Sequence, residues 1–436
     1  MSGIGTALLG FTVMLLLIGL RMPVGLAMLA AGSAGYIWFA GWAPLLGYMK
    51  TMPYYLFANY TLSVIPFFIL MGAFAEQSGL STDLFRAASR VFGRLRGGLA
   101  MAVIGACTGF GAICGSSVAT TATFGRAALP ELKRYGYDSG LSTATIAAGG
   151  TLGILIPPSV ILVVYAISTE QNIVKLFQAA LMPGLLAALF YCLVIAWVVA
   201  RNPEAGPARA PEIAGGSRFT VWPAIFVAVL VVGGIYGGIF TPTEGAAVGA
   251  VAMLLTGVLR GSLDFADVRT SLLQTAETTA MIFAILLGAE VFNAFLALSQ
   301  LPAHAAEVIA ASGFPPYAVL GFLLAFYVVL GSVMDELAMI LLTLPVFFPV
   351  VSALDFGLPS EEVAIWFGIL VLIVVGVGLT APPIGLNVFV VGALAKDVPI
   401  TVTYRSVLPF IAADLVRLVL VAAFPALALW LVRALS

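Results

Sequence analysis

The sequence is poor in charged residues. Only 9% of its 436 residues are Asp, Glu, Lys or Arg, whereas 62% are hydrophobic, and the mean hydropathy is +1.13. A soluble globular protein carries about 25% charged and about 45–50% apolar residues. The composition therefore excludes a large soluble core and predicts a single membrane domain over residues 1–436, solvated by the lipid bilayer.

Cysteine and histidine are scarce as well. The three cysteines, Cys107, Cys114 and Cys192, form no CxxC pair, which favours small apolar filling over a disulfide or a metal site. A single histidine, His304, cannot build a zinc site. The net charge of −1 gives no reason to expect nucleic acid as a partner. P-loop, HExxH and GxSxG motifs are absent, so we expect neither an enzyme nor an organic cofactor.

Apolar runs of about 20 residues, the length that crosses a bilayer, recur along the chain. They lie near residues 3–20, 23–43, 61–78, 176–200, 219–240, 243–259, 278–298 and 406–432. The first run lacks a basic flank, so we expect a retained span and not a cleaved signal peptide. Residues 80–95 and 263–276 are amphipathic and expected at the interface. Residues 45–60 either extend the second span or form a surface helix.

Three regions do not resemble simple spans, because glycine, small hydroxyl residues and paired prolines interrupt them. Residues 97–135 contain GAICGSS, residues 139–168 contain GGTLGILIPPS, and residues 363–395 contain GVGLTAPPIGLN. Paired prolines remove backbone donors and disfavour helix before them. A helix broken at membrane depth is tolerated only where its backbone is buried in protein or lines a cavity. We predict a re-entrant hairpin at 97–135 and discontinuous helices at 139–168 and 363–395.

The two halves of the chain resemble each other. FFILMGA at 67–73 recurs as FAILLGA at 283–289, and Leu129-Pro130 recurs as Leu344-Pro345, with shifts of 216 and 215 residues. The Pro157-Pro158 pair recurs as Pro382-Pro383 after 225 residues. These matches predict repeats at 61–200 and 278–432, the second with a hairpin at about 317–350. Five crossings between them would invert the second copy, a pattern typical of secondary transporters.

Basic residues support this topology. If neither hairpin crosses the membrane, 14 of the 19 Lys and Arg residues fall on one side, including Arg209 and Arg218 of the polar linker 201–218. The positive-inside rule makes that side the cytoplasm. Both termini are then predicted to face outward, the first hairpin to enter from the cytoplasm, and the second from outside. The predicted fold is an all-α polytopic membrane protein of two inverted repeats, each with a re-entrant hairpin and a discontinuous helix.

The interrupted segments carry groups that suit sodium. A dehydrated sodium ion needs several close oxygens, which unwound carbonyls and hydroxyls supply without a buried charge. We predict sodium binding at Gly115, Ser116, Ser117, Gly150, Thr151 and Gly153, and at Gly331, Ser332, Asp335, Gly378, Thr380 and Ala381. The alternative for each is structural, because small residues let helices approach and hydroxyls bond their own helix. Helix amino ends at the hairpin tips suit an anionic substrate.

Charged residues at membrane depth are candidates by default. Arg126 in the first hairpin either holds a substrate carboxylate or pairs with a carboxylate at the cytoplasmic face. Asp335 either ligates an ion or is solvated, while Glu336 is expected to be solvated. Asp414 and Arg417, three residues apart on one helix, are expected to form a structural ion pair.

Several segments resemble one family. The motifs SVIPFFILMGAFAEQSGLS, GRLRGGLA, FGAICGSSVATTAT, ALPELKRYGYD, GGTLGILIPPS, PTEGAAVGA, MDELAMILLTLPVFFP and GLTAPPIGLN resemble the large membrane subunit of tripartite ATP-independent periplasmic (TRAP) transporters. The resemblance covers nearly the whole chain. It implies a bacterial or archaeal inner-membrane protein of elevator type that imports an organic acid anion, such as a C4-dicarboxylate, keto acid or sugar acid, with a sodium gradient.

The resemblance also implies partners and a substrate site. A soluble periplasmic binding protein would deliver the substrate, and a small four-helix membrane subunit, expected on a separate chain, would bind the large one. The substrate would lie between the two hairpin tips. We expect substrate binding at Arg126, Ser117, Pro157, Pro382 and Asn387. The alternatives are a stand-alone sodium/anion symporter of the same superfamily and, from another class, an intramembrane enzyme or a channel.

Overall fold

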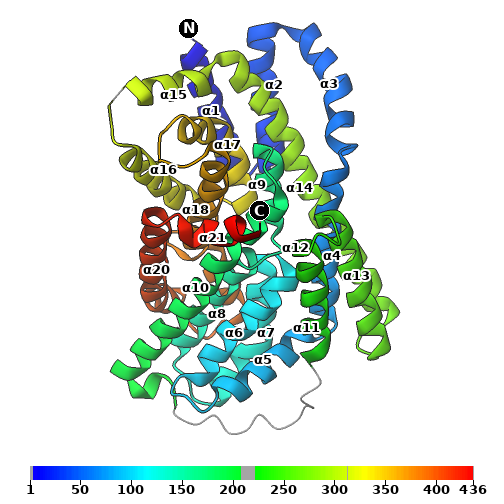
Figure 1. Ribbon diagram of the computed structural model, residues 1–436, viewed down its shortest axis with the longest axis vertical. Coiled ribbons are helices and arrows are strands. Elements are labelled where there is room, and N and C mark those ends of the chain that lie inside the picture. The colour runs from blue at the N-terminus through cyan, green and yellow to red at the C-terminus, as the bar shows by residue number, and fades with distance from the viewer. Residues whose placement is uncertain (1–2, 208–220, 312, 436) are drawn as a thin grey trace.

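The computed structural model describes residues 3–207, 221–311 and 313–435, and within these ranges every regular element is a helix (Figure 1). The predicted linker 201–218 falls largely outside them, and so do Arg209 and Arg218. Six of the described helices are long and apolar enough to cross a membrane, or seven if one bent pair counts as a span. The chain is an all-α polytopic membrane protein built of two inverted repeats.

The first repeat contains a short hairpin followed by a discontinuous helix. Its elements are α4 (Val64–Gln77), α5 (Leu80–Phe92), α6 (Gly98–Cys114), α7 (Ser117–Arg134), α8 (Ser139–Leu155), α9 (Val160–Thr169) and α10 (Ile173–Arg201). The hairpin is α6 and α7. The discontinuous helix is α8 and α9, bent by 43° between Leu155 and Val160. Asp138 begins α8 by accepting a hydrogen bond from Leu141 N at 2.8 Å, as expected of an N-cap carboxylate.

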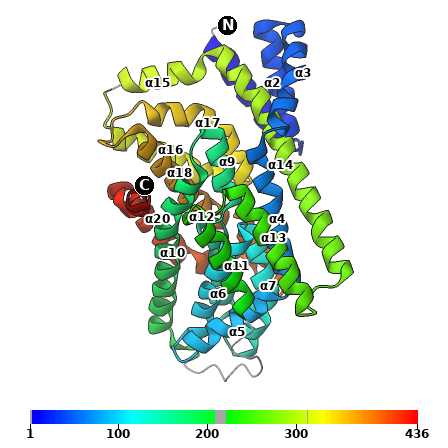
Figure 2. The ribbon, with the colours of Figure 1, turned by 45° about the vertical axis from the view of Figure 1, so that its right-hand side comes forward.

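The second repeat has the same order of elements. They are α14 (Phe265–Ser299), α15 (Leu301–Ala311), α16 (Pro316–Gly331), α17 (Glu336–Ser352), α18 (Ser360–Thr380), α19 (Leu386–Leu394) and α20 (Ile400–Ala423). The hairpin α16–α17 and the hairpin α6–α7 lie in opposite halves of the molecule, with the discontinuous helices between them (Figures 1 and 2). Helix α18 is buried from Val363 to Thr380 and forms the centre of the second repeat.

The remaining helices flank the repeats. They are α1 (Gly3–Gly19), α2 (Val24–Ala40), α3 (Trp42–Phe57) and η1 (Tyr60–Ser63) before the first repeat, η2 (Pro203–Ala205) after it, α11 (Trp222–Ala228), η4 (Val229–Gly233), α12 (Gly234–Tyr236) and α13 (Pro242–Leu259) before the second, and α21 (Ala426–Leu435) at the end. Helices α2 and α14 cross in backbone contact, because a Cβ added to Gly288 would lie 2.1 Å from the carbonyl oxygen of Gly25. Small residues permit such close crossings in membranes.

Two expectations about helix boundaries are wrong. The amphipathic segment 263–276 and the span 278–298 form one helix, α14, because neither glycine nor proline interrupts the chain between Phe265 and Leu287. Asp264 and Asp267 form a capping box at its start. The expected span 406–432 is instead divided into α20 and α21 around Pro425, which cannot continue a helix.

Residues 45–60 lie mostly in a separate helix, α3, because Gly41, with φ +90°, ends α2.

Candidate functional site

The tip of the first hairpin lies against the break of the first discontinuous helix. Gly115 ends α6 in the left-handed region, with φ +63°, and Ser116 caps α7 through a 3.4 Å hydrogen bond from Ala119 N. A Cβ added to Gly115 would lie 2.9 Å from the carbonyl oxygen of Pro158. Glycine is therefore required twice, for the turn and for the close approach of the two backbones.

The last turns of α8 lie directly against α7. A Cβ added to Gly150 would lie 1.7 Å from Thr121 Oγ1, and one added to Gly153 would lie 2.4 Å from Thr120 Oγ1. The Cβ added to Gly153 would also lie 2.5 Å from the carbonyl oxygen of Ser116. Two glycines three residues apart on α8 thus bring hydroxyl and carbonyl oxygens of the hairpin against bare backbone.

Asn387 joins this tip from the second repeat. Its Nδ2 lies 2.8 Å from Ser117 Oγ and donates to the carbonyl oxygen of Ala147 at 3.1 Å. Neither Asn387 nor Ser117 is exposed. Both were predicted as substrate-binding residues, and the structure brings them together across 270 positions of sequence.

Thr121 is a candidate ligand that the sequence prediction missed. Its side chain is fully buried, and its hydroxyl has no hydrogen-bond partner among the described residues. It lies beside Gly150, whose added Cβ would also lie 3.2 Å from Asn387 Nδ2. Thr121 lies four residues after Ser117 on one helix and therefore on the same face. This spacing is the sequence signal that could have identified it as a ligand. Ser117, Thr121 and Asn387 with the Gly150 backbone form what we call the first tip cluster.

The second hairpin tip is built on another pair of glycines. A Cβ added to Gly378 would lie 2.6 Å from the carbonyl carbon of Gly331, so the backbones of α16 and α18 touch. The carbonyl oxygen of Ser332 accepts hydrogen bonds from Ile384 N at 3.1 Å and Gly385 N at 3.4 Å, which ties the tip to the second break, Ala381–Gly385. Three of the predicted sodium-binding residues, Gly331, Ser332 and Gly378, therefore lie at this tip, and Ala381 begins the break that is bonded to it.

The side chains of the remaining second-tip candidates are occupied within their own segments. Asp335 caps α17 by accepting from Leu337 N at 3.1 Å and Ala338 N at 3.3 Å. Thr380 Oγ1 donates to the carbonyl oxygen of Val377 at 3.0 Å.

Glu336, expected to be solvated, is only 8% exposed, and its Oε2 has no partner among the described residues. The expectation for Glu336 is wrong because the hairpin folds its first turn of α17 inward.

Two predicted residues point away from the first tip cluster. The hydroxyl of Thr151 faces α10, 2.9 Å from Tyr191 Oη, and not the hairpin. Arg126 lies nine residues beyond Ser117 on α7, about 13 Å along a helix. Its guanidinium forms an ion pair with Glu76 of α4, the second of the two alternatives for this residue. Substrate contact by Arg126 stays a prediction.

The two breaks differ in exposure. Both proline pairs are joined by cis peptide bonds. Pro157 is buried, whereas Pro382 is exposed, so only the second break presents its prolines at the surface.

A second ion pair, Lys133–Asp397 at 2.5 Å, connects the end of α7 to the loop before α20. This hydrogen bond lowers the pKa of the Asp397 carboxyl below its usual value.

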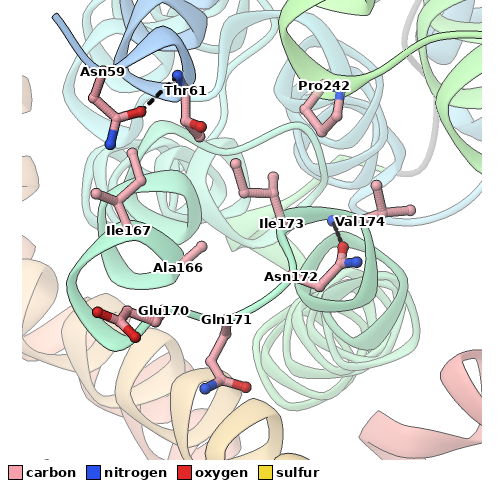
Figure 3. A pocket seen from close by; sticks show the side chains of 10 residues that line it. All are labelled: Asn59, Thr61, Ala166, Ile167, Glu170, Gln171, Asn172, Ile173, Val174 and Pro242. Atoms are coloured by element: carbon pink, nitrogen blue, oxygen red, sulfur yellow. Dashed lines mark hydrogen bonds between the residues drawn. The ribbon is translucent and has the colours of Figure 1, made fainter.

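A separate open pocket lies away from all these residues (Figure 3). It has a volume of about 440 Å³ and lies between the turn joining α9 to α10 and the starts of η1 and α13. The amide oxygens of its two asparagines are already engaged, since Asn59 accepts from Thr61 N at 2.9 Å and Asn172 from Val174 N at 2.8 Å. No predicted sodium or substrate residue lines it, so the pocket is not the predicted midplane site.

Comparison with known proteins identifies the family. A model described as "Tripartite ATP-independent periplasmic transporter, DctM component" matches residues 11–427. The chain belongs to this DctM family. It is 37% identical over 379 residues to the C4-dicarboxylate TRAP transporter large permease protein DctM of Pseudomonas aeruginosa, covering 85% of this chain and 86% of that protein.

Other similarities extend over nearly the whole DctM chain. The ectoine TRAP transporter large permease protein TeaC of Halomonas elongata is 31% identical, with 96% of each protein covered. The crystal structure of the YdaH transporter of Alcanivorax borkumensis superposes with a TM-score of 0.65 at 17% identity, over 87% of this chain and 88% of that one. At this identity the likeness supports the fold alone. The recognition as a TRAP large membrane subunit is confirmed.

The Arg126–Glu76 pair supports a direct prediction. Because the Arg126 side chain is 54% exposed, and such pairs are worth about 0–1 kcal/mol, we expect Arg126→Ala and Glu76→Gln to lower the initial uptake rate similarly, by about fivefold or less. Arg134→Ala, an exposed arginine on the same helix, is the control and should leave the rate unchanged. Abolished uptake in Arg126→Ala with normal uptake in Glu76→Gln would instead place Arg126 at the substrate.

Proposed function

We propose that this TRAP large permease imports an organic acid anion with a sodium gradient. A soluble periplasmic binding protein delivers the anion, and a small membrane subunit completes the complex in the inner membrane. Both hairpins and both discontinuous helices move together across the membrane in an elevator-type cycle. We propose a carboxylate as the substrate, because the relative with 37% identity is a C4-dicarboxylate TRAP transporter protein.

The first tip cluster carries the sodium proposal. Its side-chain ligands are neutral and buried: the hydroxyls of Ser117 and Thr121 and the amide oxygen of Asn387. The bare backbone at Gly150 lies beside them. Neutral oxygens of this kind, with carbonyls of a broken helix, replace the hydration shell of a monovalent cation. The Thr121 hydroxyl, which has no partner among the described residues, is available for such an ion.

The anion proposal is supported by helix α7 of the first hairpin. It begins at the first tip with Ser117, and its amino end directs partial positive charge there, whereas the amino end of α17 is already capped by the Asp335 carboxylate. We propose that the substrate carboxylate lies between the two tips, near the amino end of α7 and beside the second break with Pro382. Ser117 and Asn387 then serve the first ion, and the second ion lies between Ser332 and Ala381.

Uptake into proteoliposomes tests the function. With the small subunit and the binding protein added, uptake of the anion that the binding protein retains is expected to saturate with sodium and to stop when potassium replaces it. Ser117→Ala is expected to raise the half-saturating sodium concentration about tenfold, because it removes an ion ligand and leaves Asn387 partly unpaired, a loss of about 1–3 kcal/mol. Ser89→Ala, which removes a buried serine hydroxyl bonded within α5, is the control. Equal uptake in potassium would refute sodium coupling.

A further inference from the structure

A buried ion pair lies in the second repeat. Asp414 and Arg417 of α20 approach within 2.8 Å, and their side chains are 3% and 0% exposed. Removing two charges from water costs several kcal/mol per ion, and an apolar pair of similar size is often more stable. Stability alone is therefore a poor reason for charges at this depth, and their contacts indicate what else they do.

The pair is joined to the first repeat by two hydroxyls. Tyr191 of α10 donates to Asp414 Oδ2 at 2.7 Å, and Tyr191 Oη lies 2.9 Å from Thr151 Oγ1 of α8. Arg417 Nη1 donates to the carbonyl oxygen of Pro183, also on α10, at 3.2 Å. The single proton of Tyr191 is directed to Asp414, and Thr151 Oγ1 also lies 2.7 Å from the carbonyl oxygen of Ala148 in its own helix, so the Thr151 hydroxyl shares its proton between Ala148 and Tyr191. A polar chain thus runs from α20 through α10 to α8.

This chain ends beside the first tip cluster. Thr151 directly follows Gly150 and precedes Gly153 by two residues, and those two glycines face the hairpin while Thr151 faces the opposite side. On that opposite side Gly376 of α18 also approaches, since its added Cβ would lie 3.6 Å from Thr151 Cβ. The turn of α8 that offers its backbone to the hairpin is held from behind by the second repeat.

We propose that Tyr191, oriented by Asp414 and Arg417, is a positioning residue for the sodium ion at the first tip. It fixes the rotation of the last turn of α8 through Thr151, so that the backbone at Gly150 and Gly153 meets α7. This inference rests on the proposed sodium coupling. Tyr191, Asp414 and Arg417 do not touch the ion. They change its affinity only through the position of α8.

A hydrogen bond made directly between α20 and α8 provides a matched control. Thr403 of α20 donates to Thr143 Oγ1 of α8 at 2.9 Å, and both side chains are buried. Thr143 lies seven residues before Gly150, about 10 Å along a helix. Removing this bond therefore loosens the same α8–α20 contact without acting on the glycine turn.

The test measures sodium binding to the purified complex, with sodium chloride as the probe. The midpoint of thermal unfolding is recorded at increasing sodium, with potassium keeping the ionic strength constant. Tyr191→Phe, which keeps the ring against Phe410, and Thr151→Val are each expected to raise the half-effect sodium concentration three- to tenfold. The double variant should be no worse than the stronger single variant, because both remove one contact. Thr403→Val should change it less than twofold.

Each contrary result has a distinct meaning. If wild-type protein is stabilised equally by potassium, the proposed sodium coupling fails. If wild type responds to sodium alone but Tyr191→Phe and Thr151→Val match it, or if their effects multiply in the double variant, the positioning role of Tyr191 is refuted while sodium coupling stands. A general loss of stability would lower the unfolding midpoint by the same amount at every sodium concentration. If Tyr191→Phe and Thr151→Val show only such a uniform loss, and Thr403→Val shows it too, the positioning role is also refuted.

Discussion

Gly378→Ala is expected to abolish uptake while the protein still inserts and folds. Glycine to alanine inside a helix normally stabilises it by about 1 kcal/mol, so helix propensity cannot explain a loss. The added Cβ would lie 2.6 Å from the carbonyl carbon and 2.7 Å from the Cα of Gly331. Both neighbours are backbone, so the second hairpin must move away from α18 and open the second tip. The measurement is the initial uptake rate, normalised to protein in the membrane.

The control for this change lies two residues away on the same helix. Gly376→Ala introduces the same methyl group, but its nearest neighbour is Thr151 Cβ at 3.6 Å, an ordinary contact. We expect this variant to retain at least half of the wild-type rate. Normal uptake by Gly378→Ala would show that the contact between the second hairpin and α18 is not needed for transport.

Asn387→Ala is expected to have the second large effect, a rise of at least tenfold in the half-saturating sodium concentration. The change leaves the Ser117 hydroxyl and the Ala147 carbonyl without their amide partner in a site closed to water. An unsatisfied buried polar group costs about 1–3 kcal/mol, and each 1.4 kcal/mol corresponds to a factor of ten. Asn387 also contributes an oxygen to the first tip cluster, which alanine cannot replace.

An exposed asparagine serves as the control for Asn387. Asn172→Ala removes the cap of α10, where the side chain accepts from Val174 N at 2.8 Å, and should cost about 1 kcal/mol of stability. Because Asn172 lies outside both tips, the sodium dependence of uptake should stay the same. An unaltered sodium response in Asn387→Ala would remove this residue from the ion site.

The sequence predicts the interruptions of the helices better than their contacts. Proline pairs and glycine-rich turns act locally on backbone geometry, so the hairpin tips and breaks could be placed from residue types alone. The continuity of α14 was missed because amphipathic and apolar stretches were treated as separate elements, although no helix breaker lies between them. The positive-inside argument for the outward-facing termini remains a prediction.

The side-chain partners could not be predicted, since they depend on how distant segments meet. Ser117 finds Asn387 across 270 positions, and the Thr151 hydroxyl turns to Tyr191 on a helix that no local pattern connects with it. Arg126 was correctly recognised as a charge in need of a partner, but the identity of Glu76 follows only from the contact between α4 and the hairpin. Residue type alone does not show which way a hydroxyl points, and its direction decides its role.

The amide of Asn387 makes the two halves of the molecule chemically unequal. A shift of 225 residues, the one that relates the two proline pairs, places Leu162 at the corresponding position of the first half. Leu162 is buried and has no polar group to offer the opposite hairpin. The two repeats therefore offer similar backbones at their breaks, but only the second provides an amide, and that amide lies at the tip of the first hairpin. For the two proposed sodium ions, the two tips offer different ligands, so their affinities are expected to differ and the ions to bind in a fixed order.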